Sequence, residues 1–240
     1  MNTDITRRDI IAAAAGIAAF PAVAASNLST SKTAGKDAQD APLTKPYDII
    51  ATPIKSDSNT VRFLFTYDCP FCRSYHNGLI QWGNTIPAPM RFAVTPVITS
   101  HSDNLVSAVF GRLLVQGLAP AKLNAYDYDM YAQIQGDSDT GQVGKVHISP
   151  NDILRSVAAA TGLSGKQIAD YINAKGKQIE KQIPLHAGYV QTYGLTATPA
   201  VAIGGRIVVN PDHSGGNPQQ YLLLLNAMVS RAIQGGLNAL

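Results

Sequence analysis

The sequence predicts an α/β fold that begins with a parallel strand–helix–strand unit. Residues 60–67, TVRFLFTY, are dense in β-branched and aromatic side chains, which is typical of a buried central strand. Pro70 suits the first turn of a helix that follows directly, and residues 90–97, MRFAVTPV, predict a second strand. Strand, helix and strand in this order imply a parallel crossover. A short edge strand is expected before them, at residues 47–54.

The C-terminal part predicts a β-hairpin followed by a helix. Two β-rich runs within residues 198–210 flank the pair Gly204 and Gly205. Two adjacent glycines favour a tight hairpin turn, because both turn positions need a positive φ. Asn217 and Pro218 then predict the cap and the first turn of a final helix.

Residues 103–193, between these two halves, are predicted to be mostly helical. Ser164 and Gln167 have the spacing of a capping box, which marks the start of a helix. This helix is expected to run towards Tyr193 with a kink at Pro184, because proline interrupts helical hydrogen bonding. The strand-containing halves are therefore predicted to enclose a helical insertion.

The first 25 residues are typical of an export signal. Arg7 and Arg8 precede an alanine-rich, weakly apolar stretch, and small residues near Ala24 or Ala25 offer cleavage sites. The adjacent arginines resemble a bacterial twin-arginine signal, and an ordinary secretory signal is the alternative. The apolar stretch is shorter than the roughly 20 residues of a spanning helix. We therefore expect a bacterial protein that is exported to the periplasm and loses this segment by cleavage.

Composition sets the remaining limits. Residues 26–46 are small, polar and punctuated by proline, which predicts a flexible linker before a folded domain at residues 47–240. Of the 240 residues, 45% are hydrophobic and 15% are charged, as expected for a globular domain. The net charge of +3 is spread along the chain without runs of like charge, which argues against nucleic acid as a partner.

The sequence contains only two cysteines, Cys69 and Cys72. A disulfide between them would close a very short loop, which stabilises little in the chain-entropy treatment. Cys69 lies where the predicted strand gives way to the helix, so unpaired N–H groups and the helix dipole would stabilise its thiolate. Cys72 lies one helical turn later, where its thiol can resolve a mixed disulfide formed by Cys69. Pro70 restricts the backbone between them, and the spacing predicts a redox-active pair.

Two other interpretations of the cysteine pair stay open. His76 follows on the same helix face, and Cys69, Cys72 and His76 could hold a metal ion, although a structural zinc site needs a fourth ligand. The pair could also be two inert, buried apolar side chains. Covalent haem is excluded on this motif, because Arg73 occupies the histidine position of C-x-x-C-H. We expect no metal, and no cofactor other than the Cys69–Cys72 disulfide.

The C-P-x-C motif, in combination with the TATPA segment at residues 196–200, resembles the thioredoxin superfamily. The helices at about 103–193 resemble the insertion of its DsbA-like branch, and the start YDIIATPIKSDSNTVRFLFTYDCPFC is similar to the start of those proteins. The resemblance covers about residues 47–235. It implies an α/β thioredoxin fold with a helical insertion between the βαβ and ββα halves.

The resemblance also implies a substrate-binding surface around Cys69. It implies that the bond between Thr198 and Pro199 is cis, and that Pro199 lies opposite Cys69. The backbone of Thr198 could then hold an extended substrate chain by strand-like hydrogen bonds. Pro70 and Phe71 complete the expected surface, with Phe71 as an exposed aromatic side chain that touches the substrate.

One position departs from the family pattern. Many relatives carry a buried acid six residues before the first cysteine, where this chain has Phe63. Two nearby residues are candidate modulators of the cysteine pair. Asp68 would raise the pKa of Cys69 as a neighbouring anion, or it is simply a solvated residue at a strand end. His76 could favour the Cys69 thiolate if charged, but a partly exposed helix position that faces away from the motif is the simpler expectation.

These features predict an exported thiol:disulfide oxidoreductase that oxidises cysteine pairs in exported substrate proteins. A membrane or soluble redox partner would restore its disulfide. Disulfide isomerase and reductase are alternatives, and Thr198 and Phe63 resemble the DsbC and DsbG isomerases. Those isomerases dimerise through an extra domain that residues 26–46 cannot supply, so a monomer is expected. A chaperone, or a metal carrier that uses Cys69, Cys72 and His76, is the alternative from a different class.

Overall fold

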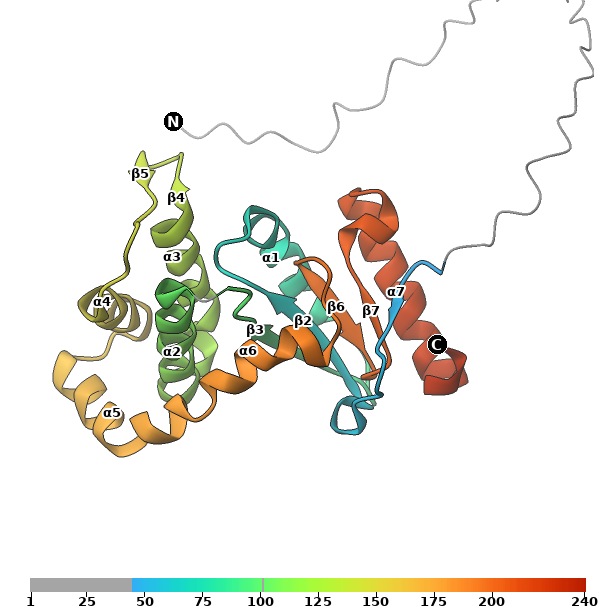
Figure 1. Cartoon of the computed structure of the whole chain (residues 1–240), viewed down its shortest axis with the longest axis horizontal. Coiled ribbons are helices and arrows are strands. Elements are labelled where there is room, and N and C mark those ends of the chain that lie inside the picture. The colour runs from blue at the N-terminus through green and yellow to red at the C-terminus, as the bar shows by residue number, and fades with distance from the viewer. Residues whose placement is uncertain (1–44, 101) are drawn as a thin grey trace, which may run out of the picture. The chain divides into compact units, whose positions relative to one another are not determined.

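The computed structural model of the chain describes residues 45–100 and 102–240, which belong to one compact unit. The predicted export signal and all but the last two residues of the predicted linker lie outside the described residues. Within the described part, the strands of the main sheet and the helices around them follow each other in the predicted order (Figure 1), and the differences lie in the insertion.

A five-stranded sheet forms the centre of the fold. β2 (Thr60–Phe65) and β3 (Arg91–Pro96) are parallel and are joined by α1 (Pro70–Gly83), whereas β6 (Ala200–Ile203) runs antiparallel to β2 on its other side. The order across the sheet is β1 (Asp48–Ile49), β7 (Ile207–Val209), β6, β2 and β3. β1 is shorter than the edge strand expected from the sequence, and β3 forms the opposite edge.

Local sequence signals explain the C-terminal half. Gly204 and Gly205 have φ values of 62° and 61°, and the turn is closed by a hydrogen bond from the Arg206 N–H to the Ile203 carbonyl at 3.1 Å. The final helix is α7 (Pro218–Gly235). It begins as predicted, because the Asn217 side chain accepts hydrogen bonds from two N–H groups of its first turn.

A helical insertion lies between β3 and β6, on the left of Figure 1. It also contains a small hairpin that the sequence did not predict, β4 (Gly136–Asp137) with β5 (Gln142–Val143). The insertion helices are α2 (Asp103–Leu118), α3 (Leu123–Gln135), α4 (Pro150–Thr161), α5 (Gly165–Glu180) and α6 (Ile183–Thr192), with a short 3-10 turn at Pro120–Lys122.

The prediction of one kinked helix reaching Tyr193 was wrong. α5 ends at Glu180, and α6 begins at Ile183 as a separate helix. The break precedes Pro184 because proline fits the first turn of a helix, where its missing N–H has no partner to lose. The predicted capping box at Ser164 and Gln167 does open α5.

Both faces of the sheet are covered. Alternate residues of β2 point to opposite sides, so Phe63 and Phe65 join the larger apolar core and Leu64 joins the smaller one. The larger core includes residues of α1, α7 and the insertion. The smaller core contacts Tyr189 and Val190 of α6 and includes Tyr193, which directly follows that helix. This packing fixes the end of β2, from which the cysteine motif follows.

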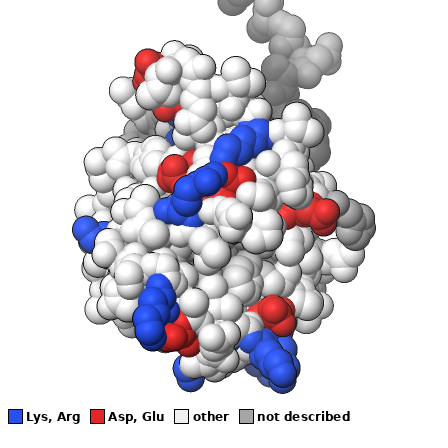
Figure 2. Space-filling model, turned by 90° about the vertical axis from the view of Figure 1, so that its left-hand side faces the viewer, with Lys and Arg blue, Asp and Glu red and all other residues white. Residues whose placement is uncertain are grey.

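The insertion presents a surface on which opposite charges are interspersed. Figure 2 shows Lys and Arg side chains beside Asp and Glu side chains on this face, which is otherwise mostly uncharged. Lys145 and Arg155, for example, both form ion pairs with Asp152. In residues 45–100 and 102–240, no helix combines the length and the apolar character that crossing a membrane requires.

Candidate active site

Cys69 occupies the N-cap position of α1, at the turn between β2 and the helix. The N–H of Cys72 donates a hydrogen bond to Cys69 Sγ at 3.2 Å, so the sulfur takes the place of a capping oxygen. Pro70 begins the helix, where a proline has no hydrogen bond to lose. The two cysteines are free thiols in this structure, Cys69 partly exposed and Cys72 buried.

A segment from the far end of the sequence lies beside Cys69. The peptide bond between Thr198 and Pro199 is cis, and β6 starts at the next residue. Because β6 pairs with β2, this segment lies next to the cysteine turn. When Cys69 is protonated, its thiol donates a hydrogen bond to the Thr198 carbonyl at 3.2 Å. The structure therefore brings Cys69, Thr198 and Pro199 together.

The surroundings of the two thiols drive their pKa values apart. The side chain of Cys72 donates a hydrogen bond that is the largest cause lowering the pKa of Cys69, to about 6. The Thr198 side chain and the N–H groups of Cys72 and Phe71 lower it further, and burial opposes them. Burial is the main cause that raises the pKa of Cys72, and the neighbouring Cys69 adds to it. At neutral pH this arrangement gives a Cys69 thiolate beside a protonated Cys72.

A cavity of about 410 Å³ opens next to Cys69. Its lining includes Asp68, Cys69 and residues 195–198. Asp68 is exposed and accepts a hydrogen bond from the Thr66 hydroxyl at 2.7 Å. Phe71 is 67% exposed, so its ring is available for contact beside the reactive thiol. The cavity and Phe71 together offer an apolar contact and main-chain polar groups around one sulfur atom.

His76 is not the partly exposed residue that the sequence suggested, because its side chain is completely buried. Its Nδ1 lies 3.2 Å from the Tyr131 hydroxyl, and its Nε2 lies 3.6 Å from Asp127 Oδ2. Burial lowers the pKa of His76, although the Asp127 charge acts in the opposite direction. An imidazole of lowered pKa is neutral at pH 7, so His76 does not stabilise the thiolate by its charge.

The burial of His76 follows from packing that its own segment does not encode. Both residues that its ring nitrogens face, Asp127 and Tyr131, belong to α3 of the insertion. Within residues 45–100 and 102–240, no three His, Cys, Asp or Glu side chains are placed so that they could hold a metal ion. The geometry thus gives no support to a metal site built from Cys69, Cys72 and His76.

The insertion also supplies residues that sequence reasoning missed. Gln135, the last residue of α3, donates hydrogen bonds from Nε2 to the carbonyls of Tyr67 at 2.6 Å and Cys69 at 3.1 Å. Arg73 of α1 donates to the Gly136 carbonyl at 2.5 Å. These contacts hold the cysteine turn against the end of α3. No local pattern marks Gln135, because its partners are main-chain atoms more than 60 residues away.

A buried acid is present, but it does not come from β2. Phe63 is fully buried in the apolar core, whereas Asp127 of α3 is buried behind the cysteine helix. Asp127 accepts hydrogen bonds from the Tyr67 hydroxyl at 2.5 Å and from Arg112 Nε at 2.9 Å. Its carboxylate is therefore paired with a guanidinium from α2.

Comparisons with known proteins agree with this fold. No protein-family model matches the sequence, and no curated protein matches it. The structure is similar to that of Pseudomonas aeruginosa DsbA, with a TM-score of 0.61, 17% identity, and coverage of 79% of this chain and 93% of that one. Salmonella enterica serovar Typhimurium SrgA is similar with a TM-score of 0.60 and 20% identity, over 76% of this chain and 96% of that one.

A third similar structure includes a ligand. It is a variant of Proteus mirabilis DsbA with a non-covalently bound peptide, PWATCDS, and it matches with a TM-score of 0.61 and 15% identity, over 79% of this chain and 96% of that one. At these identities the likeness shows the fold. The chain has the thioredoxin fold with the helical insertion of DsbA proteins, as the sequence predicted.

Proposed function

We propose that the chain is a thiol:disulfide oxidoreductase that oxidises cysteine pairs in substrate proteins through Cys69 and Cys72. The observation that carries this proposal is the opposite perturbation of two neighbouring thiols. Cys69 has a pKa lowered to about 6 at a helix start, and Cys72 is buried one turn later with a raised pKa. In such a pair, Cys69 can act as the nucleophile or as the leaving thiolate, and the buried Cys72 can act as the resolving thiol.

The reaction starts from the Cys69–Cys72 disulfide. A substrate thiolate attacks Cys69 Sγ, the bond between the two sulfurs breaks, and Cys72 leaves with the electron pair and takes up a proton. The second substrate thiolate then attacks the substrate sulfur of this mixed disulfide. Cys69 leaves as a thiolate, the substrate gains a disulfide, and the cysteine pair of the enzyme has accepted two electrons. A thiol of low pKa leaves faster, so the pKa of Cys69 favours the second step.

Substrate binding is proposed at the cavity beside Cys69. Thr198 presents its main chain there, next to the cis bond to Pro199, and can pair with an extended substrate as a strand does. Phe71 offers an exposed apolar contact at the other side of the sulfur, with Pro70 beside it. The peptide that accompanies Proteus mirabilis DsbA, PWATCDS, contains a cysteine and supports a peptide as the class of ligand.

The compartment and partners belong to the same proposal. Arg7 and Arg8, followed by an alanine-rich stretch, support export to a bacterial periplasm, where disulfides persist. The substrates would then be exported proteins with cysteine pairs. Each turnover leaves Cys69 and Cys72 reduced, so a membrane or soluble partner must accept two electrons from them. We propose that the protein acts as a monomer.

Two assays run side by side test the proposal and its alternatives. The first measures disulfide formation in a reduced, unfolded substrate protein, and the second measures refolding of a substrate with scrambled disulfides. An oxidase is fast in the first assay, whereas an isomerase is fast in the second. The variant Cys69→Ser should lose both activities. In the second assay the Cys69 thiolate of Cys72→Ser can attack a substrate disulfide and release one substrate thiolate, and the mixed disulfide should accumulate because no resolving thiol is present.

The same assays separate enzyme from chaperone. If Cys69→Ser keeps the full refolding yield, the protein assists folding without thiol chemistry and the proposal is wrong. If the wild type forms disulfides no faster than an equal concentration of glutathione disulfide, the pair has no special reactivity and the proposal is again wrong.

A further inference from the structure

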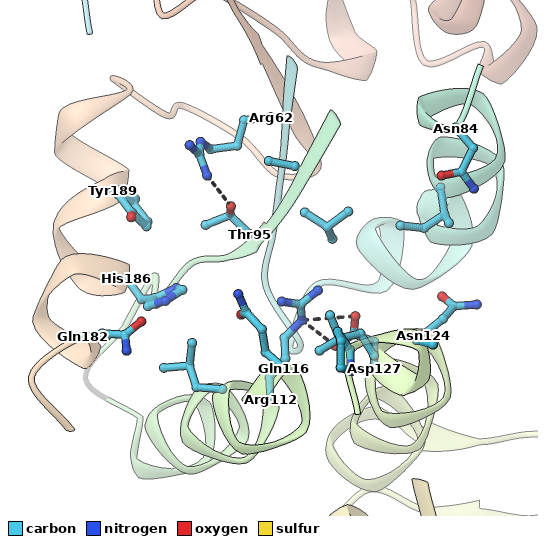
Figure 3. Close-up of a pocket in the computed structure, with 17 residues that line it drawn as sticks. Arg62, Asn84, Thr95, Arg112, Gln116, Asn124, Asp127, Gln182, His186 and Tyr189 are labelled. Atoms are coloured by element: carbon cyan, nitrogen blue, oxygen red, sulfur yellow. Dashed lines mark hydrogen bonds and ion pairs between the residues drawn. The ribbon is translucent and has the colours of Figure 1, made fainter. Parts of the chain in front are cut away.

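A second, larger cavity of about 660 Å³ lies where the edge strand β3 meets α1, α2, α3 and α6 (Figure 3). None of its lining residues also lines the cavity beside Cys69. Its volume is within the range of about 300–1,000 Å³ that is usual for small-molecule sites. The thiol chemistry proposed above makes no use of it.

Arg112 projects into this cavity from α2 with unused hydrogen-bond donors. Its side chain is only 3% exposed, and its Nε donates to Asp127 Oδ1 at 2.9 Å and Oδ2 at 3.2 Å. Among the described residues, neither Nη1 nor Nη2 of Arg112 has a hydrogen-bond partner. In Figure 3 both terminal nitrogens point away from Asp127 and into the cavity. Solvent in the cavity reaches these nitrogens, because His76 Nε2 is the one fully buried side-chain N or O atom of the described residues that lacks a hydrogen-bond partner. The terminal N–H groups of Arg112 are therefore free to donate to a ligand in place of water.

The geometry of a guanidinium determines what fits there. Asp127 uses the Nε side, so the opposite edge of Arg112, formed by Nη1 and Nη2, stays free. This edge presents two parallel N–H groups that match the two oxygens of a carboxylate. The Arg112 Cζ also lies 5.6 Å from the ring centre of Phe65, within the range of a cation–π contact.

Free hydrogen-bond donors at the cavity, and not its net charge, favour an acceptor such as a carboxylate. The charged residues that line the cavity are Arg62, Arg112 and Asp127, and Arg62 also forms an ion pair with Asp57 at 2.8 Å, so the positive and negative charges are equal in number. Arg62 donates from Nη1 to the Thr95 hydroxyl at 2.8 Å, so it is held at the cavity wall. His186 adds no charge at neutral pH, because burial lowers its pKa, although the hydrogen bond between its Nδ1 and the Pro96 carbonyl at 2.7 Å acts in the opposite direction.

The remaining polar groups suit an uncharged part of the same ligand. With Nδ1 as the donor, His186 Nε2 is an acceptor, and Figure 3 shows the ring at the cavity. Asn84, Gln116 and Asn124 are exposed amides at the rim, and each amide offers both donors and an acceptor.

We propose that this cavity binds a small organic acid whose carboxylate lies on the Nη1–Nη2 edge of Arg112. The rim amides and His186 Nε2 hydrogen-bond the rest of the molecule. This site does not depend on the thiol chemistry, since neither cysteine lines it. A carboxylate can also belong to the end of a peptide chain, and the experiment distinguishes these two sources.

The test is a calorimetric titration of the full chain with succinate as the probe. We expect saturable binding with a Kd of about 1 mM or lower, and binding of the neutral isostere succinamide that is weaker by about tenfold or more. Amide chemical shifts should change around Arg112, Gln116 and His186, and should stay constant around Cys69. The same binding by Cys69→Ser would separate this site from the proposed function.

The critical variant is Arg112→Lys, which keeps the positive charge opposite Asp127 but loses the planar fork. It should weaken succinate binding by about tenfold, whereas the control Arg155→Lys on the exposed surface of α4 should bind as the wild type does. If Arg112→Lys does not fold, the double variant Arg112→Met with Asp127→Asn removes both charges together and should abolish binding.

Three results would overturn the proposal. One is the absence of succinate binding up to about 10 mM, which is weaker than a specific site of this size should show. Another is unchanged binding by a folded Arg112 variant. The third uses two forms of triglycine, one with a free C-terminal carboxylate and one with an amidated C-terminus. If only the form with the free carboxylate binds, and succinate does not, the site binds the C-terminus of a peptide and the assignment to a small organic acid is wrong.

Discussion

The low pKa of Cys69 can be tested by removing the group that contributes most to it, the side chain of Cys72. The variant Cys72→Ala deletes the hydrogen bond from this side chain but keeps the Cys72 N–H that donates to Cys69 Sγ at 3.2 Å. A hydrogen bond to a charged group is worth about 1.5–3 kcal/mol, and one pKa unit corresponds to about 1.4 kcal/mol.

The pKa of Cys69 should therefore rise by about 1–2 units. Because Cys69 is partly exposed and solvent weakens the interaction, we expect the lower end of this range. From a pKa of about 6 in the wild type, the variant would reach about 7. At pH 7 the thiolate fraction would then fall from about 90% to about 50%.

The assay is the rate of alkylation of reduced protein by iodoacetamide as a function of pH. Only the thiolate reacts, so the midpoint of the profile reports the pKa of Cys69. The matched control is Cys72→Ser, whose hydroxyl can still donate, and its midpoint should stay close to that of the wild type. A wild-type midpoint near the ordinary value of about 8.5, or identical midpoints for Cys72→Ala and the wild type, would refute the reasoning.

Three further predictions follow from the same contacts. Gln135→Leu removes the hydrogen bonds that the Gln135 side chain donates to the carbonyls of Tyr67 and Cys69. The free energy of unfolding, measured in urea, should fall by about 1–3 kcal/mol. A fall of less than about 0.5 kcal/mol would contradict this role of Gln135. Phe71→Ala should change the free energy of unfolding by less than about 0.5 kcal/mol, because the side chain is exposed. It should raise the KM for a protein substrate and leave the rate of reaction with a small dithiol unchanged. Equal effects on both substrates would exclude a role of Phe71 in substrate binding. Between pH 6 and about 8.5, Cys69 binds more protons in the unfolded protein than in the folded protein, because folding lowers its pKa. The Tm of the reduced protein should therefore rise with pH relative to the Tm of the oxidised protein across this range. A Tm difference that does not change with pH would contradict the lowered pKa.

The features that the sequence predicted correctly depend on neighbouring residues. Pro70 opens α1, the pair Ser164 and Gln167 caps α5, and Asn217 caps α7, because each acts on backbone groups within one turn. The fold class could be predicted for the same reason, since the strands and helices follow each other along the chain in a recognisable order.

The features that the sequence did not predict depend on contacts between distant segments. His76 has the local pattern of a partly exposed helix residue, but α3 covers it and supplies Tyr131 and Asp127 as neighbours. Gln135 looks like an ordinary helix end, and its role appears only when α3 lies against the cysteine turn. The cavity at Arg112 is likewise formed by elements that are separate in the sequence.

The central claim is that the Cys69–Cys72 pair accepts electrons from substrate thiols. Its most direct test is the reduction potential of the pair, measured at equilibrium with glutathione. A stabilised Cys69 thiolate favours the reduced form, so we predict a potential well above the about −270 mV of thioredoxin and closer to the about −120 mV of DsbA. A potential at or below about −270 mV would mean that the pair prefers to donate electrons, and it would contradict the proposed oxidase.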